Sequence, residues 1–344
     1  MEYRRLGTSG LKVSPLCLGT MDFGEGAGER TAGRIVAMAR EAGVNFIDTA
    51  DVNAGGLSER IVGRALRRDR DRWVLATKSG NSMGSGPNQT GMGRKWIMEA
   101  IDGSLRRLGT DYVDIYYLDI DDGVTPLEET IATLGDLIRL GKVRGWGFSN
   151  FSAWRIAEMI GICAKFGVAR PVAAQPCYNA VTRMAERDTL PACAHFGVGV
   201  VSYSPLARGV LTGKYAPGAA PPKHSRAGRG DRRMLETEFR QESLTIARKI
   251  QARAGKRAMT AAQFAVNWIL NNALVTSVVA GPRTVGQWSG YLGALKHPFT
   301  AADEAFVDGL VQIGHASTPG YTDPRYPVAG RRPRVAPHLG PDLI

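Results

Sequence analysis

The chain has 344 residues, 44% of them hydrophobic and 22% charged, and its formal net charge is +12. No apolar run approaches the roughly 18 residues that span a bilayer, and the N-terminus lacks the apolar core of a secretory signal, so we expect a cytoplasmic protein without a membrane partner. Four isolated cysteines predict neither a disulfide framework nor a metal site, and basic clusters without interleaved aromatic residues favour a small anionic ligand over nucleic acid.

The first residues predict a β-hairpin, with strands at 3–6 and 11–13 and Gly10 at the turn. After the hairpin, short apolar strands alternate with amphipathic helices such as 30–42, 95–108 and 127–140. The expected strands are 16–18, 45–48, 73–77, 113–118, 143–148, 172–175, 198–203 and 276–279. This alternation is typical of βα units, and eight strands fit a closed barrel. The sequence therefore predicts an α/β fold, a (β/α)₈ TIM barrel preceded by an N-terminal β-hairpin.

We expect a single barrel domain over residues 1–315 and an irregular C-terminal tail over 316–344, because the tail has six prolines and no hydrophobic periodicity. The tail is either disordered or draped over the mouth of the barrel. Two long connections, 79–94 and 216–235, follow strands and so overhang that same mouth, where barrel enzymes keep their sites. Substrate specificity is expected to reside in these segments, and their sequences do not identify the substrate.

Polar side chains close four of the predicted strands. Asp48, Lys78 and Asp119 end three of them, and Ser149 with Asn150 ends a fourth. Because the carboxyl ends of parallel strands converge on one face of a barrel, these side chains are candidates for a site. An aspartate and a lysine at neighbouring strand ends can pair, which offsets the desolvation of each charge. A purely structural ion pair at the rim is the alternative interpretation.

Several short segments stand in a regular order along nearly the whole chain, many of them at the ends of the predicted strands. They are Gly19-Thr20-Met21, Phe46-Ile47-Asp48-Thr49-Ala50-Asp51, Ser58-Glu59, Ala76-Thr77-Lys78, Gly141-Lys142-Val143-Arg144, Gly147-Phe148-Ser149-Asn150-Phe151, Ser204-Pro205-Leu206, Gly213-Lys214-Tyr215 and Gly281-Pro282-Arg283 with Gln287. In this order they resemble the aldo-keto reductase family. Each segment alone is weak evidence, whereas the ordered set is strong.

The resemblance implies an active site of tyrosine, lysine, aspartate and histidine that reduces a carbonyl with NADPH. Asp48 and Lys78 match the aspartate and the lysine. Asn53 stands where the family has its tyrosine, and Asp119 stands where it has its histidine. An asparagine amide does not release a proton at neutral pH, and an aspartate donates a hydrogen bond only when protonated. We therefore expect Asp48, Asn53, Lys78 and Asp119 to form an atypical catalytic site.

The resemblance also implies a binding site for NADP(H). Ser149, Asn150 and Gln175 resemble the clamp on the nicotinamide carboxamide, and Tyr178 resembles the aromatic residue on which the nicotinamide stacks. The remaining expected contacts lie in the first strand end, the pyrophosphate loop and the adenosine-phosphate segment: Gly19, Thr20, Met21, Ser204, Leu206, Arg208, Gly209, Lys214, Gly281, Arg283 and Gln287. Arg283 favours NADP(H) over NAD(H), because a guanidinium matches a 2′-phosphate. Gly290-Tyr291 departs from the family's Glu-Asn, so the adenine contacts are expected to differ.

Three functions follow from these residues. The first is a NADP(H)-dependent oxidoreductase that reduces an iminium carbon or a conjugated C=C bond of a small-molecule substrate instead of a simple carbonyl. The second is a non-redox enzyme, such as a dehydratase, an isomerase or a cyclase, that uses Asp119 and Lys78 as acid and base. The third is a cofactor-bound regulatory protein without catalysis. The sequence does not indicate the oligomeric state.

Overall fold

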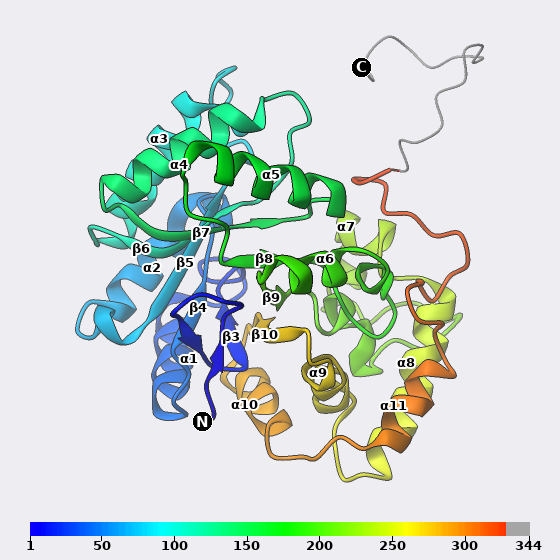
Figure 1. The fold of residues 1–344 in the computed structure, drawn as a ribbon. Coiled ribbons are helices and arrows are strands. Elements are labelled where there is room, and N and C mark those ends of the chain that lie inside the picture. The colour runs from blue at the N-terminus through cyan, green and yellow to red at the C-terminus, as the bar shows by residue number, and fades with distance from the viewer. Residues whose placement is uncertain (328–344) are drawn as a thin grey trace.

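The computed structural model of the chain describes residues 1–327, which form a (β/α)₈ barrel behind a short antiparallel hairpin (Figure 1). Eight parallel strands close on themselves in chain order, with the last strand paired to the first. The barrel strands are β3 (Leu16–Gly19), β4 (Phe46–Asp48), β5 (Val74–Ser79), β6 (Val113–Leu118), β7 (Val143–Ser149), β8 (Ala173–Gln175), β9 (Gly199–Ser202) and β10 (Val275–Ala280). The predicted fold class is thereby confirmed.

The α-helices surround the barrel, and short 3₁₀ helices interrupt the loops. The α-helices are α1 (Glu29–Glu41), α2 (Leu57–Leu66), α3 (Arg94–Leu108), α4 (Leu127–Arg139), α5 (Ala153–Phe166), α6 (Thr189–Phe196), α7 (Arg232–Glu236), α8 (Gln241–Gly255), α9 (Ala261–Asn271), α10 (Val285–Ala294) and α11 (Ala301–Asp308). The 3₁₀ helices are η1 (Asn53–Gly56), η2 (Arg70–Arg72), η3 (Met184–Glu186), η4 (Ala207–Thr212) and η5 (Ala227–Arg229). None of the described helices is long and apolar enough to cross a membrane.

The hairpin of β1 (Arg4–Arg5) and β2 (Lys12–Val13) packs on the amino-terminal end of the barrel. Leu6 and Val13 join the apolar cluster that the strands enclose, and the Thr8 amide donates to the Gly197 carbonyl at 2.8 Å before β9. This end of the barrel is therefore closed by apolar packing. The cavity described below opens at the opposite, carboxyl end of the strands.

Strand periodicity decides which side chains point into the barrel. Side chains alternate between the two faces of a strand, so Asp48 lies on the same face as Phe46, and Lys78 on the same face as Val74. Phe46 and Val74 belong to the enclosed apolar cluster. Asp48 and Lys78 therefore point into the carboxyl end of the barrel, directly above that core.

The C-terminal tail is described only in part. Residues 316–327 contain no helix or strand, as expected, but Ala316 forms an isolated bridge with Thr182 and residues 325 and 326 line the cavity described below. This part of the tail is draped over the mouth of the barrel. The predicted tail residues 328–344 lie outside the described residues.

Two helical glycines provide a matched test of packing around the barrel. A Cβ on Gly63 in α2 would lie 2.1 Å from the Leu108 carbonyl oxygen, whereas a Cβ on Gly161 in α5 would meet no atom within 4 Å. We expect Gly63→Ala to destabilise the fold by about 1–3 kcal/mol through overpacking. Gly161→Ala should stabilise the fold by about 0.5–1 kcal/mol, because alanine lowers the conformational entropy of the backbone in the unfolded chain. Urea unfolding of both variants measures the difference, and equal effects would contradict the packing of α2 against α3.

Candidate active site

A cavity of about 700 Å³ opens at the carboxyl ends of the barrel strands. Its volume lies within the range usual for ligand pockets, which is roughly 300–1,000 Å³. Every residue predicted for the catalytic and cofactor sites lines this cavity, with the exception of Tyr178. The structure thus brings together side chains from eight separate stretches of sequence.

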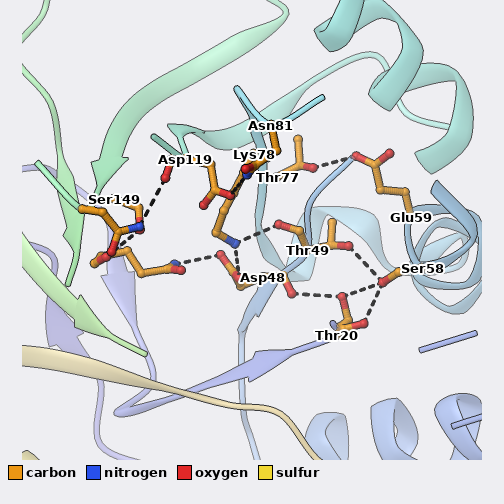
Figure 2. Close-up of polar contacts among 12 residues, drawn as sticks. Thr20, Asp48, Thr49, Ser58, Glu59, Thr77, Lys78, Asn81, Asp119 and Ser149 are labelled. Carbon is orange, nitrogen blue, oxygen red and sulfur yellow. Dashed lines mark hydrogen bonds and ion pairs between the residues drawn. The ribbon is translucent and has the colours of Figure 1, made fainter. Parts of the chain in front are cut away.

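Lys78 and Asp48 form a buried ion pair at the floor of the cavity (Figure 2). The Lys78 ammonium donates to Asp48 Oδ1 and, at 2.9 Å, to the Thr49 carbonyl. The Gln175 amide donates to Asp48 Oδ2 at 3.1 Å, so both carboxylate oxygens are satisfied. The two side chains are only 8% and 6% exposed, and their pairing offsets the cost of removing both charges from water.

Asp119 lies beside this pair, at the end of β6. Its Oδ2 accepts from the Asn81 side-chain amide, and its carbonyl accepts from the Asn150 amide at 3.3 Å. Burial raises the pKa of the Asp119 carboxyl, Lys78 opposes that shift, and the negative charge of Asp48 adds to it. The carboxyl therefore keeps its proton to a higher pH than an exposed aspartate does.

Asn53 opens the short turn between β4 and α2. It begins η1, in which Ala54 and Gly55 adopt left-handed backbone conformations with φ of 49° and 60°. The Asn53 side chain lines the cavity with Asp48, Lys78 and Asp119. The predicted catalytic positions are therefore neighbours, and the Asn53 amide occupies the place of the tyrosine that the resemblance implies.

A chain of hydrogen bonds orders the amides at the end of β7. Ser149 Oγ donates to the Gln175 carbonyl at 2.8 Å, and the Asn150 amide donates to Ser149 Oγ at 2.9 Å. The Tyr203 hydroxyl donates to Asn150 Oδ1 at 2.9 Å. Asn150 has φ of 64°, which turns its side chain off the strand and toward the cavity. The arrangement presents fixed amide and hydroxyl groups to a ligand.

The placement expected for Tyr178 is wrong. This side chain is 1% exposed, its hydroxyl donates to Glu186 Oε1 at 2.6 Å, and its ring packs on Trp268 with centroids 5.1 Å apart. The reason is that β8 ends at Gln175, so the strand's alternation does not extend to position 178. The aromatic residue that lines the cavity is Tyr203, which directly follows β9. The rule of polar residues at strand ends could have found it in the sequence.

The side of the cavity next to β9 and β10 suits phosphate groups. Ser204, Ala207 and Arg208 adopt left-handed backbone conformations with φ of 58°, 46° and 51°, a type of turn that can expose successive amides. Lys214 extends over the same loop, and a Cβ on Gly209 would lie 3.0 Å from its ammonium nitrogen. A side chain at position 209 would therefore displace the Lys214 ammonium from this loop.

The first turn of α10 supplies a second anion-binding feature. Thr284 caps the helix by accepting from the Gln287 amide at 3.1 Å, and the Arg283 amide donates to Gln287 Oε1 at 2.7 Å. The helix N-terminus carries a partial positive charge, and the Arg283 side chain lines the cavity beside it. A Cβ on Gly26 would lie 2.5 Å from Arg283 Cδ, so the loop after β3 packs against this arginine.

Sequence reasoning missed several residues that line the cavity, among them Tyr203, Arg226, Arg325 and Tyr326. Arg226 pairs with Asp231 at 3.0 Å, in the connection that was expected to overhang the mouth. Arg325 and Tyr326 belong to the irregular tail, where no strand or helix pattern in the sequence indicates direction. Only the fold could bring them to the site.

The whole architecture, from barrel to cavity, defines a known class of proteins. The family model described as the Aldo/keto reductase family matches residues 15–312. The chain therefore belongs to the aldo-keto reductase family.

Curated relatives span most of the chain. It is 37% identical over 286 residues to a probable voltage-gated potassium channel subunit beta of Oryza sativa subsp. japonica, covering 82% of this chain and 87% of that protein. A protein of the same description from Arabidopsis thaliana matches at 37% identity with the same coverage. A putative voltage-gated potassium channel subunit beta of Schizosaccharomyces pombe is 36% identical, covering 82% and 84%.

A second buried carboxyl lies behind the Asn53 turn. Asp51 is 1% exposed, and its Oδ2 has no hydrogen-bond partner among residues 1–327. Burial raises the pKa of this carboxyl to about 7, and the negative charge of Glu59 adds to the shift. Glu59 is itself held by Arg107 Nε at 2.6 Å and by Thr77 Oγ1 at 2.6 Å.

This shift predicts a pH-dependent stability. Because the pKa of Asp51 is higher in the folded than in the unfolded chain, the folded state binds more of this proton between pH about 4 and about 7, and stability falls as pH rises through that window. Asp51→Asn removes the titration, so its free energy of unfolding should exceed that of the wild type by more than about 1 kcal/mol above pH 7, with a smaller difference near pH 4.

Urea unfolding across this range measures the difference. Asp71→Asn, which removes an exposed carboxylate, is the matched control and should parallel the wild type. A pH-independent difference between Asp51→Asn and the wild type would contradict the raised pKa.

Proposed function

We propose that the protein is a NADP(H)-dependent oxidoreductase that acts on a small molecule whose reduction needs no proton from a phenol. The observation that carries this proposal is that a single cavity contains an ordered amide cluster, a buried lysine–aspartate pair and phosphate-suited cations. Membership of the aldo-keto reductase family supports oxidoreductase chemistry in general.

The residues present fit a phosphorylated dinucleotide. Lys214 and Arg283 line the cavity, and within residues 1–327 neither has a carboxylate at ion-pair distance. Uncompensated cations beside a helix N-terminus attract phosphate groups, and a guanidinium suits a 2′-phosphate. Ser149, Asn150 and Gln175 are available to hold the carboxamide, with the Tyr203 ring beside them for stacking.

Asn53 and Asp119 limit the reactions that we propose for this site. When bound, the nicotinamide supplies a hydride, with its two electrons, to an electrophilic carbon of the substrate. Asn53 donates a hydrogen bond but no proton. An iminium carbon becomes a neutral amine on accepting a hydride, so that substrate class requires no acid at position 53. For a conjugated C=C bond, a protonated Asp119 would hydrogen-bond the carbonyl oxygen and pass its proton to the enolate that hydride addition at the β-carbon leaves.

The redox proposal explains the ion pair better than acid–base chemistry without redox does. A lysine that acts as a base needs a nitrogen free to accept a proton, whereas Lys78 Nζ donates to Asp48 Oδ1 inside a buried ion pair. The Thr49 carbonyl holds a second ammonium hydrogen. We therefore place Lys78 as a fixed positive charge beside the reacting carbon and not as a proton acceptor.

The comparisons support a second candidate function. The relatives described above carry the names of potassium channel beta subunits. The resemblance seen in the sequence sets Asn53 and Asp119 where the family has its tyrosine and histidine. A nucleotide-binding subunit without turnover would satisfy both observations. It predicts that the protein binds NADPH but oxidises it with no aldehyde, iminium or conjugated ketone under conditions in which the first proposal predicts turnover.

Nucleotide titration tests the cofactor assignment. We expect micromolar or tighter binding of NADPH, followed by the change in nucleotide fluorescence, and weaker binding of NADH. Arg283→Met should weaken NADPH binding by about tenfold and leave NADH binding nearly unchanged, because only the 2′-phosphate loses a charge-assisted contact. Arg60→Met, an exposed arginine on α2, is the control. Absence of NADPH binding at micromolar concentration would contradict the proposal.

Placing the family's tyrosine and histidine at positions 53 and 119 tests whether the site lacks only a general acid for aldehyde reduction. Asn53→Tyr combined with Asp119→His should increase NADPH-dependent reduction of a generic aldehyde by about a hundredfold or more, the usual contribution of a positioned general acid. The absorbance of NADPH follows the rate, and the single variants are expected to gain less. Unchanged activity in a folded double variant that still binds NADPH would show that the site differs in more than these two positions.

A further inference from the structure

Residues 316–327, here called the C-terminal strap, are attached to the rim of the barrel at several points. Ser317 Oγ lies 2.8 Å from Ser243 Oγ, and the Thr318 hydroxyl donates to Glu242 at 2.9 Å, both in α8. Tyr321 lies under the Arg240 guanidinium, 3.8 Å from ring centroid to Cζ. The strap is therefore held to α8 by side-chain contacts spaced along its length.

Asp323 fixes the end of the strap that crosses the cavity. Its two carboxylate oxygens accept from Arg233 Nη1 at 2.7 Å and Nη2 at 2.5 Å, a bidentate pair with α7. The Arg325 amide also donates to Asp323 Oδ1, at 2.9 Å. This turn sets the position from which the Arg325 side chain extends over the mouth.

Arg325 reaches the catalytic end of the cavity. Its Nη2 donates to Asn81 Oδ1 at 2.6 Å, and the Asn81 amide in turn donates to Asp119 Oδ2 (Figure 2 shows this second contact). The positive charge of Arg325 lowers the pKa of Asp119 against the effect of burial, which is consistent with this proximity. One amide side chain therefore separates the guanidinium from the carboxyl beside the ion pair.

The other cations that line the cavity already have assigned partners. Lys78, Arg208, Arg226 and Arg233 pair with carboxylates, respectively Asp48, Glu238, Asp231 and Asp323. Lys214 and Arg283 lie on the side proposed for the cofactor phosphates. Within residues 1–327, Arg325 is the remaining cavity cation, and it has only a neutral amide oxygen at hydrogen-bond distance.

From this geometry we propose that Arg325 is a specificity-determining residue that binds a carboxylate of the substrate, and that the substrate class is a small carboxylic acid whose reacting carbon lies between that carboxylate and Asp119. The proposal rests on the proposed function, since it concerns the substrate of the same site. A guanidinium binds a carboxylate with two parallel hydrogen bonds, which fixes orientation as well as affinity. A substrate held in this way would span from the strap to the floor of the cavity.

The test compares phenylacetate with its neutral analogue phenylacetamide as ligands, by calorimetric titration of the full chain. Titrations with and without saturating NADPH separate the two proposals, because nucleotide binding is scored independently of anion preference. We expect the wild type to bind the carboxylate about tenfold more tightly than the amide, the effect of one charge-assisted contact.

Variants at position 325 test whether the preference for the carboxylate comes from Arg325. Arg325→Met should abolish the preference, and Arg325→Lys, which keeps the charge but not the two-pronged geometry, should retain part of it. Arg232→Met is the matched control, because Arg232 is 89% exposed on α7 and does not line the cavity. The control should behave as the wild type.

The assignment would be overturned by equal binding of the two ligands by the wild type, by no binding of the carboxylate at millimolar concentration, or by a preference that survives Arg325→Met. A preference lost equally in Arg232→Met would also overturn it, because it would reflect overall charge. None of these outcomes depends on whether NADPH binds.

Discussion

The buried pairing of Lys78 with Asp48 is the interaction on which the site depends. Neither charge could remain at the floor of the barrel alone, since the cost of removing an unpaired ion from water is several kcal/mol. The pair also orders its surroundings, because Gln175 and the Thr49 carbonyl satisfy the remaining polar groups. Strands β4 and β5 pair with Asp48 opposite Ala76. The register of these two strands therefore fixes where the two charged groups lie in the cavity.

Around this pair, the cavity has two sides with different chemistry. The amides at the end of β7 and Arg283 before α10 line the side proposed for the cofactor. Asn53 and Asp119 instead offer an amide and a carboxyl with a raised pKa. In the proposed reaction, Lys78 supplies a positive charge and Asn53 a neutral hydrogen-bond donor, with no phenol at position 53. This combination favours substrates whose electrophilic carbon accepts a hydride without a proton from position 53.

The strap adds a polar boundary on the open side of that cavity. Its attachment through Asp323 and Arg233 places Arg325 near the Asn81–Asp119 contact, so residues more than two hundred positions apart in sequence share one hydrogen-bond chain. The barrel supplies the reactive groups, and the irregular segment supplies a charge that can recognise a ligand. A fixed scaffold with variable loops at one end permits this division.

The sequence by itself determined the barrel, the order of its strands and the position of Asp48, Lys78 and Asp119, because strand periodicity and polar strand ends are local properties that fix which face a side chain occupies. Asn53 was located through the family resemblance, at the position of the family's tyrosine. The tertiary structure alone decided that Tyr178 packs on Trp268, away from the cavity, and that Arg325 reaches Asn81. These positions depend on where a strand stops and how an irregular segment packs, which are set by contacts between residues distant in sequence.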